Sequence, residues 1–339
     1  MPSAIDPGLN PEQLAFWDEN GYLIIEDALD QQTVADLLAE THRMLDEDLD
    51  LKNHPMTRFS TGEGDKEHVG DDYFLTSGDK VRFFFEEGSS IARPTLLPQA
   101  SLTTILLADA FDPTTNTLTK PPSRSINKIG HALHALSPRF RAISLSRSNA
   151  AIARSLGFRD ARILQSMVIC KQPEIGGAVP PHQDSTFLYT DPPSAVGFWY
   201  ALEDATEKNG CLSFARGSHK RAEVGKRFVR TGGGTGFVDN EGLRWPEGMG
   251  KSGVGGVNGS EMKEEYTLGP VKAGSLILIH GNLLHKSEKN TSQKSRFIYT
   301  FHAIEGGDGN EKTSHVYDER NWLQPTKEGF SRLYDVEAR

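Results

Sequence analysis

The second half of the chain, after residue 159, consists of short apolar runs that are separated by turn residues. The runs are rich in β-branched and aromatic residues, and Gly, Pro, Asn or Asp bound them, which is typical of strands. This pattern predicts an all-β core, with helices from the first half packed on its outside. The predicted strands lie in ILQSMVICKQP, AVGFWYALEDA, GCLSFARGS, GSLILIHG and RFIYTFHAIE.

The first half of the chain carries helical periodicity in two long stretches. In residues 30–50, apolar side chains such as Val34 and Leu37 recur at helical spacing, and Asp30 is placed to cap the helix N-terminus. Residues 125–158 form the strongest helical region, for which we expect two helices divided near Ser137 and Pro138. Shorter patterns predict a helix in PEQLAFWDEN, a strand around residues 22–26 and a strand in VRFFFEEGS.

The sequence contains no clear linker, so we expect one domain over residues 1–339. Its predicted parts are an α-rich periphery (1–158), the β core (159–305) and a C-terminal tail that packs on that core (306–339). Residues 231–261 hold eleven of the 33 glycines and are interpreted as a mobile insertion between two strands. This insertion is a candidate lid over a site.

The composition limits the classes of partner. The chain has 339 residues, of which 37% are hydrophobic and 24% charged, as is ordinary for a globular protein. Its net charge of −9 disfavours nucleic acid or an anionic membrane as the main partner, and no run of eighteen apolar residues predicts a transmembrane helix. Since the N-terminus lacks the pattern of a secretory signal, we expect a cytoplasmic protein whose partner is a small molecule. Cys170 and Cys211 are too few for a disulfide framework, and the oligomeric state is not predicted.

The stretch GGAVPPHQDSTFLYT carries the first candidate for chemistry, because His182 and Asp184 are separated by one residue. On a strand, two such side chains would point to the same face and could bind one cation. A third ligand from a distant strand would complete a site of two histidines and one carboxylate, which leaves coordination positions of a ferrous ion open. In a chain with eleven histidines, the triplet alone is equally compatible with chance.

Two histidines are candidates for the third ligand. His280 ends an apolar run, where a histidine is often a core residue, whereas His285 opens a polar turn before the next predicted strand. Arg296, eleven residues after His285, could face the same cavity and bind a carboxylate through its planar guanidinium. It could equally be a solvated surface cation, and the residue pattern leaves both interpretations open.

Eight segments in order resemble the phytanoyl-CoA dioxygenase family of Fe(II)- and 2-oxoglutarate-dependent oxygenases. The resemblance covers nearly the whole chain, and it implies a double-stranded β-helix, the jelly-roll or cupin-like barrel with helices outside. The fold class is therefore expected to be mainly β. The segments are FWDENGYLIIEDAL, TSGDKVRFFFEEG, SINKIGHALHALSP, QSMVICKQP, PPHQDSTFLYT, LEDATEKNGCL, HGNLLHKSEKN and NWLQPT.

The resemblance also implies the site and the reaction. The expected reaction is oxidative decarboxylation of 2-oxoglutarate to succinate and carbon dioxide, coupled to hydroxylation or a related C–H oxidation of an unidentified small molecule. Its expected cofactors are Fe(II), 2-oxoglutarate and dioxygen, with ascorbate as a candidate reductant. By position, His182, Asp184 and His285 resemble the catalytic iron ligands, Arg296 resembles the arginine that holds the far carboxylate of 2-oxoglutarate, and Lys128, Met167, Trp199 and Ser287 resemble residues that line the co-substrate pocket.

Two other functions are compatible with these residues. A non-catalytic sensor module could bind 2-oxoglutarate and iron without oxidising a substrate. A metal-dependent cupin of different chemistry would share the fold and the histidines, but it would not need Arg296 at this distance from His285. The substrate itself is not predicted, because the acidic chain lacks an obvious basic cluster for the phosphates of an acyl-CoA. The aromatic residues that could form a substrate wall, or could equally be ordinary packing, are Phe187, Tyr189, Phe237 and Trp245.

Overall fold

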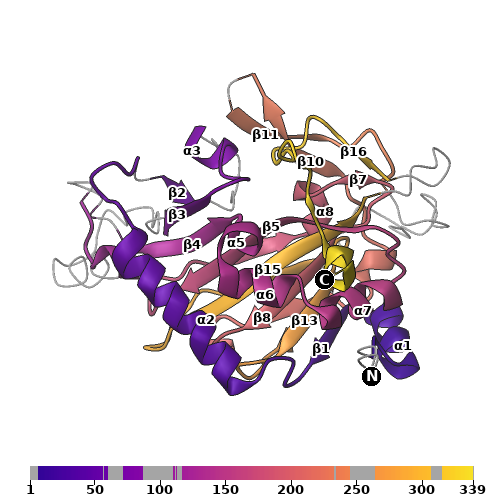
Figure 1. Cartoon of the computed structure of the whole chain (residues 1–339), viewed down its shortest axis with the longest axis horizontal. Coiled ribbons are helices and arrows are strands. Elements are labelled where there is room, and N and C mark those ends of the chain that lie inside the picture. Colours follow the sequence, from indigo (N-terminus) through magenta and orange to yellow (C-terminus); the bar gives the residue numbers. More distant parts are fainter. Residues whose placement is uncertain are drawn as a thin grey trace.

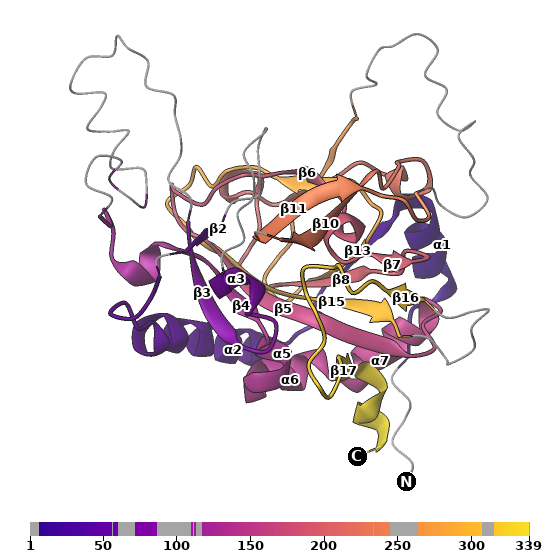
Figure 2. The same ribbon diagram turned by 90° about the horizontal axis from the view of Figure 1, so that it is seen from above.

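The protein is a sandwich of a large and a small antiparallel sheet, with most of its longer helices on the outer face of the large sheet (Figures 1 and 2). No described helix is long and apolar enough to cross a membrane. The computed structural model describes residues 7–55, 57–59, 72–86, 110, 112, 117–232, 234–244, 264–306 and 315–338.

The large sheet has the strand order β1-β13-β8-β15-β5-β4-β3-β2, and β17 also pairs with β5. Its neighbours are antiparallel except β2 and β3, which are parallel. The longest strands, β5 and β15, pair along nearly their whole length at the centre. The strands are β1 (Tyr22–Ile25), β2 (Arg58–Phe59), β3 (Val81–Glu86), β4 (Ile126–His131), β5 (Ala161–Lys171), β8 (Val196–Ala201), β13 (Leu276–His280), β15 (Arg296–Glu305) and β17 (Ser331–Arg332).

The small sheet has the order β12-β9-β14-β6 and lies against the inner face of the large sheet. Two further strand pairs, β10 with β11 and β7 with β16, flank it. Among the described residues, no hydrogen-bonded pairing joins the two sheets into a closed barrel, so the expected jelly roll is present as two facing sheets. The strands are β6 (Val179–His182), β7 (Thr190–Asp191), β9 (Leu212–Phe214), β10 (Lys226–Thr231), β11 (Gly234–Asp239), β12 (Thr267–Gly269), β14 (His285–Ser287) and β16 (Val316–Tyr317).

Helices α2, α5, α6 and α7 cover the outer face of the large sheet, while α1 lies beside its β1 edge (Figure 2). The Asp30 side chain caps α2 by accepting a hydrogen bond from the backbone N–H of Thr33 at 2.7 Å, as the sequence predicts. The helices are α1 (Pro11–Asn20), α2 (Gln31–Arg43), α3 (Asp72–Leu75), α5 (Leu133–Leu136), α6 (Pro138–Ser144), α7 (Arg147–Ser155) and α8 (Asp184–Phe187). A π-helical turn (Met44–Asp48) follows α2, and short 3₁₀ turns lie at Pro122–Arg124, Glu207–Asn209, Ser218–Lys220 and Leu333–Ala338.

The alternation of side chains along the central strands separates two hydrophobic cores. Phe198 and Phe301 pack toward the helices, whereas Trp199, one position from Phe198, and Ile298, three positions from Phe301, pack between the sheets. The five strands predicted in the second half are confirmed as β5, β8, β9, β13 and β15. Polar residues whose side chains point between the sheets, as those of Trp199 and Ile298 do, form the candidate functional site.

The helical prediction for residues 125–158 is wrong in its first part. The segment from Ile126 to His131 is strand β4, which pairs with β3 on one side and β5 on the other. Helix begins only at Leu133. The predicted break at Ser137 and Pro138 is confirmed, but a second break after Ser144 divides the region into three helices and not two. Pairing with two strands that are distant in sequence outweighs a weak local helical preference.

The Gly-rich segment begins as a β-hairpin. Strand β10 (Lys226–Thr231) pairs with β11 (Gly234–Asp239), so Gly234 and Gly236 of this segment belong to a sheet. Residues 245–263, which include most of the predicted lid, lie outside the described residues. Part of the C-terminal tail packs nearby, since Trp322 and Leu323 share a hydrophobic cluster with Phe228 of β10.

Candidate metal centre

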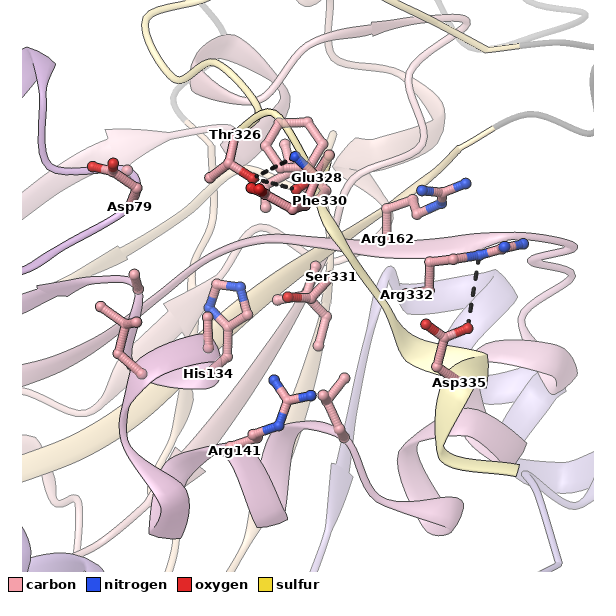
Figure 3. A pocket seen from close by; sticks show the side chains of 18 of the residues that line it. Asp79, His134, Arg141, Arg162, Thr326, Glu328, Phe330, Ser331, Arg332 and Asp335 are labelled. Carbon is pink, nitrogen blue, oxygen red and sulfur yellow. Dashed lines mark hydrogen bonds and ion pairs between the residues drawn. The ribbon is translucent and has the colours of Figure 1, made fainter. Parts of the chain in front are cut away.

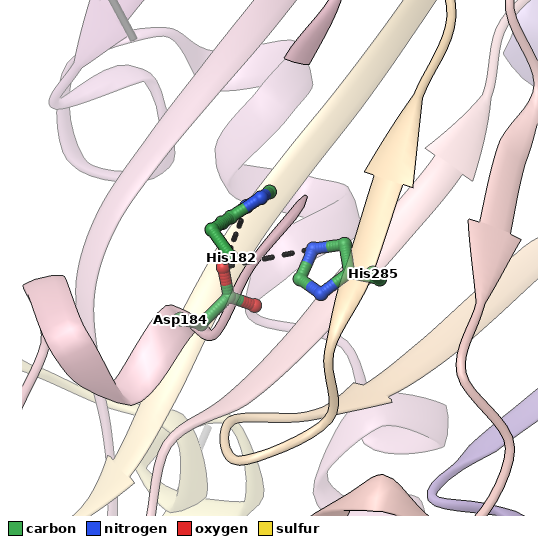
Figure 4. Close-up of side chains that lie close together, drawn as sticks. All are labelled: His182, Asp184 and His285. Carbon is green, nitrogen blue, oxygen red and sulfur yellow. Dashed lines mark ion pairs between the residues drawn. The ribbon is translucent and has the colours of Figure 1, made fainter. Parts of the chain in front are cut away.

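Three side chains from two adjacent strands and one short helix converge between the sheets (Figure 4). His182 ends β6, Asp184 opens α8 and His285 begins β14; β6 and β14 are antiparallel neighbours, with His285 paired directly to His182. The Nε2 atoms of His182 and His285 lie 3.7 Å and 3.9 Å from Oδ1 of Asp184. One potential ligand atom from each residue lies within 4.8 Å of the others, a spacing that can hold a metal ion.

The convergence of His182 and Asp184 arises differently from the prediction. The strand ends at His182, and Asp184 is the first residue of α8, where its carbonyl accepts a hydrogen bond from the Leu188 N–H at 2.9 Å. Pro180 and Pro181 have no N–H to donate to a neighbouring strand, which keeps β6 short. A turn into a helix therefore aims both side chains at one point, and strand alternation is not the cause.

The hydrogen bonds of the two imidazoles prepare them as ligands. Nδ1 of His182 lies 2.9 Å from the carbonyl oxygen of Pro180, and Nδ1 of His285 lies 3.0 Å from that of Leu283. A carbonyl only accepts, so each Nδ1 carries the hydrogen and each Nε2 presents a lone pair toward Asp184. This is the tautomer that a metal ion requires from both residues.

The protonation states of the cluster also suit a metal ion. Burial, together with the neighbouring His285, lowers the pKa of His182 to about 4, so its imidazole is neutral at physiological pH. Burial alone would raise the pKa of the Asp184 carboxyl, but the imidazoles of His302 and His285 outweigh burial and hold that pKa below its ordinary value. The cluster thus presents the neutral imidazole of His182 and the anionic carboxylate of Asp184 beside Nε2 of His285, and two imidazoles with one carboxylate are a set that fits a ferrous ion.

The alternative third ligand, His280, lies elsewhere. Its ring contacts Trp17 of α1 and His219, with centroid distances of 5.8 Å and 5.0 Å. Its Nδ1 accepts a hydrogen bond from the backbone N–H of Asn282, and burial lowers the pKa of His280 to about 3. His280 is therefore a neutral packing residue, and His285 is the histidine that joins the cluster.

Arg296 is buried, so its interpretation as a surface cation is wrong. Only 1% of its surface is exposed, and burial lowers its pKa to about 10. One guanidinium nitrogen donates to the carbonyl of Gly210 at 2.8 Å, while Nε has no hydrogen-bond partner. A buried guanidinium with unused donors is suited to binding an anionic ligand.

A second buried basic residue, Lys171, accompanies Arg296 and was missed in the sequence. The two residues are direct neighbours across β5 and β15. The Lys171 ammonium donates to the Ser287 hydroxyl oxygen at 3.0 Å and to the carbonyls of Gly177 and Glu288. In the part of the chain that the structure describes, neither Lys171 nor Arg296 forms an ion pair with a carboxylate. Counting alternate positions back from Lys171 would have placed it on the inner face with Met167.

Of the other predicted co-substrate residues, Lys128, Met167 and Trp199 project from the inner face of the large sheet, whereas Ser287 lies on the small sheet. Trp199 lies near Arg296, with the guanidinium carbon 5.6 Å from its ring centre. Lys128 of β4 is paired with Ile169 of β5, and burial holds its pKa well below the ordinary value although the Glu86 carboxylate opposes this shift. Ser287 lies two residues after His285 on the same face of β14, which connects the metal cluster to the basic pair. The buried members of the group are Lys128, Met167, Lys171, Trp199, Ser287 and Arg296.

His302 is a further residue that the sequence analysis missed. It lies on the inner face of β15, and its Nε2 is 3.3 Å from Oδ2 of Asp184. Counting alternate residues from Arg296 along RFIYTFH would have placed His302 on the same face as Arg296. The contact with Asp184 could not have been predicted, because these residues are far apart in the chain.

One side of the metal cluster is bordered by aromatic rings. The ring centroid of Phe187 lies 6.1 Å from that of His182. The ring centroid of Phe237 on β11 lies 5.8 Å from that of Phe187, and Phe237 is 43% exposed. Tyr189 instead contacts Arg227, whose guanidinium carbon lies 4.2 Å from the centre of the tyrosine ring. Trp245 lies outside the described residues. Phe187 is thus the predicted wall residue that lies beside the cluster, and Phe237 packs on the ring of Phe187.

A separate cavity of about 680 Å³ lies away from this cluster, between the C-terminal segment, α5, α6 and β5 (Figure 3). Arg162 and Arg332 in its lining both pair with Asp160. The charged residues of the lining balance, three arginines against three acidic residues, so this cavity favours neither an anion nor a cation. The lining residues concerned are Asp79, Arg141, Arg162, Glu328, Arg332 and Asp335.

The fold and the cluster together define a class of protein: a jelly roll whose two histidines and one carboxylate form the ligand set typical of non-haem iron oxygenases. Similar solved structures include the α-ketoglutarate-dependent carbocyclase SnoK from nogalamycin biosynthesis, with a TM-score of 0.53, 17% identity and coverage of 91% of this chain and 86% of SnoK. EctD from S. alaskensis, crystallised with 2-oxoglutarate and 5-hydroxyectoine, has a TM-score of 0.51 and 18% identity, covering 89% of this chain and 78% of EctD. At these identities the likeness shows the shared fold.

Sequence comparison gives the family. Residues 17–298 match the phytanoyl-CoA dioxygenase (PhyH) family. Phytanoyl-CoA dioxygenase domain-containing protein 1 of Bos taurus is 41% identical over 337 residues, which cover 96% of this chain and 99% of the relative. The chain therefore belongs to the phytanoyl-CoA dioxygenase family, and it is an enzyme of the oxygenase class.

Proposed function

We propose that this protein is an Fe(II)- and 2-oxoglutarate-dependent dioxygenase that couples oxidative decarboxylation of 2-oxoglutarate to C–H oxidation of a small molecule. The observation that carries the proposal is the pairing of two features between the sheets. One is a cluster whose imidazole lone pairs face a carboxylate. The other is a pair of buried basic residues, Arg296 and Lys171, without a described carboxylate partner. The first feature suits a metal ion, and the second suits an anionic co-substrate.

In this proposal, His182, Asp184 and His285 hold the ferrous ion on one side and leave its other side accessible. When bound, the iron supplies the redox chemistry with dioxygen that side chains cannot provide. The protein residues keep both imidazoles in the ligating tautomer and keep the carboxylate charged. Phe187 borders the cluster and Phe237 packs on Phe187, where they would contact an apolar part of the substrate and exclude water.

The co-substrate would extend from the metal toward Arg296. A guanidinium can bind the far carboxylate of 2-oxoglutarate through two parallel hydrogen bonds. Ser287 would add a hydroxyl donor, because Lys171 already donates to its oxygen and leaves the Ser287 hydrogen available. Trp199 and Met167 would form apolar walls, and Lys128 would add a basic group on the same sheet face.

The similar solved structures support the choice of co-substrate. SnoK is an α-ketoglutarate-dependent enzyme, and EctD has been crystallised with 2-oxoglutarate and also with iron. Dioxygen and ascorbate, as co-substrate and reductant, follow from membership of the family. Neither comparison assigns a primary substrate, which we propose only as a small molecule with an apolar part.

The test is succinate formation from 2-oxoglutarate by the purified protein after addition of ferrous iron, with and without dioxygen. We expect succinate that depends on both iron and oxygen, that is abolished by a chelator and that increases when the true substrate is added from fractionated metabolite pools. Absence of succinate with every fraction would contradict the proposal. Succinate without any oxidised product would instead indicate the sensor module.

A further inference from the structure

The two carboxylate oxygens of Asp184 have different partners. Oδ1 faces the Nε2 atoms of His182 and His285, at 3.7 Å and 3.9 Å. Oδ2 lies 3.3 Å from Nε2 of His302, and within the described residues it is a buried oxygen without a hydrogen-bond partner. Oδ1 is therefore the oxygen that would bind a metal ion, and Oδ2 faces a residue from another strand.

We propose that His302 is a positioning residue: its Nε2 faces Oδ2 of Asp184, to which it would donate a hydrogen bond when the site is loaded, and it so restricts this ligand to binding iron through Oδ1 alone. The inference rests on the proposed function of the cluster. A carboxylate that bound through both oxygens would occupy an additional coordination position. By engaging Oδ2, His302 keeps that position available for the co-substrate or dioxygen.

The tautomer of His302 is set by Gln165. The side-chain amide nitrogen of Gln165 lies 3.4 Å from Nδ1 of His302. An amide N–H only donates, so Nδ1 accepts and the ring hydrogen is on Nε2, which faces Asp184. The chain Gln165–His302–Asp184 thus has a consistent direction of donation from β5 through β15 to the metal ligand. Such outer hydrogen bonds orient metal ligands and affect metal affinity.

The strand register places His302 at this point. His302 is paired with Gly197 of β8, and both lie under the Asp184 carboxylate. A Cβ atom at Gly197 would lie 3.4 Å from both Asp184 Oδ2 and His302 Nε2. Gly197 therefore borders the contact between the carboxylate and the imidazole, and a methyl group there would make ordinary van der Waals contact with both.

A role for His302 as a fourth ligand is disfavoured by the same geometry. Within the described ranges, the group whose ligand atoms lie within 4.8 Å of one another is His182, Asp184 and His285, and His302 is not part of it. His302 also contacts Asp184 through Oδ2, whereas the two ligating imidazoles face Oδ1. His302 therefore contacts the carboxylate of Asp184 and is not one of the residues that surround the position of the metal ion.

The test measures binding of Co(II) to the metal-free, full-length protein, without 2-oxoglutarate or turnover. We expect His302→Ala to weaken Co(II) binding by about 10- to 100-fold, the range found for lost outer hydrogen bonds to metal ligands. His302→Gln keeps an N–H donor and should recover most of this loss. His134→Ala is the matched control, because His134 is a buried histidine that bonds to Ser166 away from the cluster, and it should bind Co(II) within about twofold of wild type.

The visible spectrum of bound Co(II) separates positioning from ligation. An unchanged coordination number in His302→Gln supports positioning, whereas a lost ligand would overturn it. Wild-type affinity in His302→Ala would also overturn the proposal. Should His302→Ala fail to fold, Gln165→Leu removes the group that sets the tautomer, and an unaltered Co(II) affinity in that variant would contradict the inference. Because the assay contains no co-substrate, failure of 2-oxoglutarate turnover leaves its result interpretable.

Discussion

At the scale of single residues, the site depends on which atom of each side chain is available. Backbone carbonyls occupy Nδ1 of His182 and His285, so their Nε2 atoms point to the same oxygen of Asp184. Arg296 is held by one hydrogen bond to Gly210 and keeps Nε unused. These hydrogen bonds leave two imidazole nitrogens and one carboxylate oxygen to bind a metal ion, and they leave Nε of Arg296 to bind a ligand.

The first prediction concerns the metal ligands. His182→Ala or Asp184→Ala should reduce iron-dependent succinate formation to background, because two donors cannot retain the ion in an open site. Circular dichroism should show an intact fold, since both residues lie at element ends. Turnover at the wild-type rate in either variant would contradict the ligand assignment.

The second prediction concerns the co-substrate cation. Arg296→Ala should raise the Kd for 2-oxoglutarate by roughly 100-fold, about 3 kcal/mol, because it removes a charge-assisted hydrogen-bond pair in a buried site. Co(II) affinity should change by less than about threefold, since Arg296 does not belong to the metal cluster. Isothermal titration of each ligand measures both quantities. Equal losses of both affinities would show that Arg296 acts on the fold and not on the co-substrate.

At the scale of elements, strand β14 joins two functions through its alternation. His285 and Ser287 point inward to the metal cluster and the Lys171 ammonium, while Lys286 between them points outward and pairs with Glu288. In the proposed function, a single strand would thereby fix the separation between the metal and the co-substrate carboxylate. The edge pairing of β14 with β6 sets the position of His182 in turn.

The third prediction follows from this alternation. Ser287→Ala should raise the KM for 2-oxoglutarate by about tenfold with little change in kcat, because one neutral hydrogen bond is worth about 1 to 1.5 kcal/mol. Lys286→Ala on the opposite face of the same strand is the matched control, and it should leave both constants unchanged. Steady-state succinate kinetics give the comparison. A similar effect of both substitutions would mean that β14 itself is distorted.

At the scale of the whole molecule, the large sheet separates a dry packing layer from a functional layer. Residues such as Phe140 and Phe301 are buried between the helices and the outer face of the sheet. The inner face carries Lys171, Arg296 and His302. Buried neutral histidines lie outside the metal cluster as well. Burial lowers the pKa of His134 to about 4 and that of His280 to about 3.

The fourth prediction concerns stability in acid. An unfolded chain protonates these histidines near their ordinary pKa of about 6.5, whereas the folded protein keeps them neutral until pH falls to their lowered values. The free energy of unfolding should therefore fall as pH decreases from about 6.5 to about 4, by up to about 1.4 kcal/mol per pH unit for each histidine. Urea unfolding of the metal-free protein at several pH values measures this slope. His134→Gln should reduce this slope by up to about 1.4 kcal/mol per pH unit, the contribution of one proton. An unchanged slope would refute the assignment of His134 as a buried neutral histidine.

Local pattern predicted most of the strands and the order of helical and β regions. Alternating apolar and aromatic runs such as that of β15 specify strands because their side chains must fill two opposite faces. The same local reasoning failed for β4, whose partners β3 and β5 come from other parts of the chain. It also assigned Asp184 to a strand, whereas α8 begins there.

By itself, the amino-acid sequence determined that the core is mainly β, and through its resemblance to a family it predicted the jelly roll and the set His182, Asp184, His285 and Arg296. Only the tertiary structure decided that His280 packs against α1, that Lys171 accompanies Arg296, and that His302 lies beside Asp184. The physical reason is the range of the interactions. Strand periodicity and turns are encoded by neighbouring residues, whereas the contact of an imidazole with a carboxylate depends on the register of strands that are far apart in the chain.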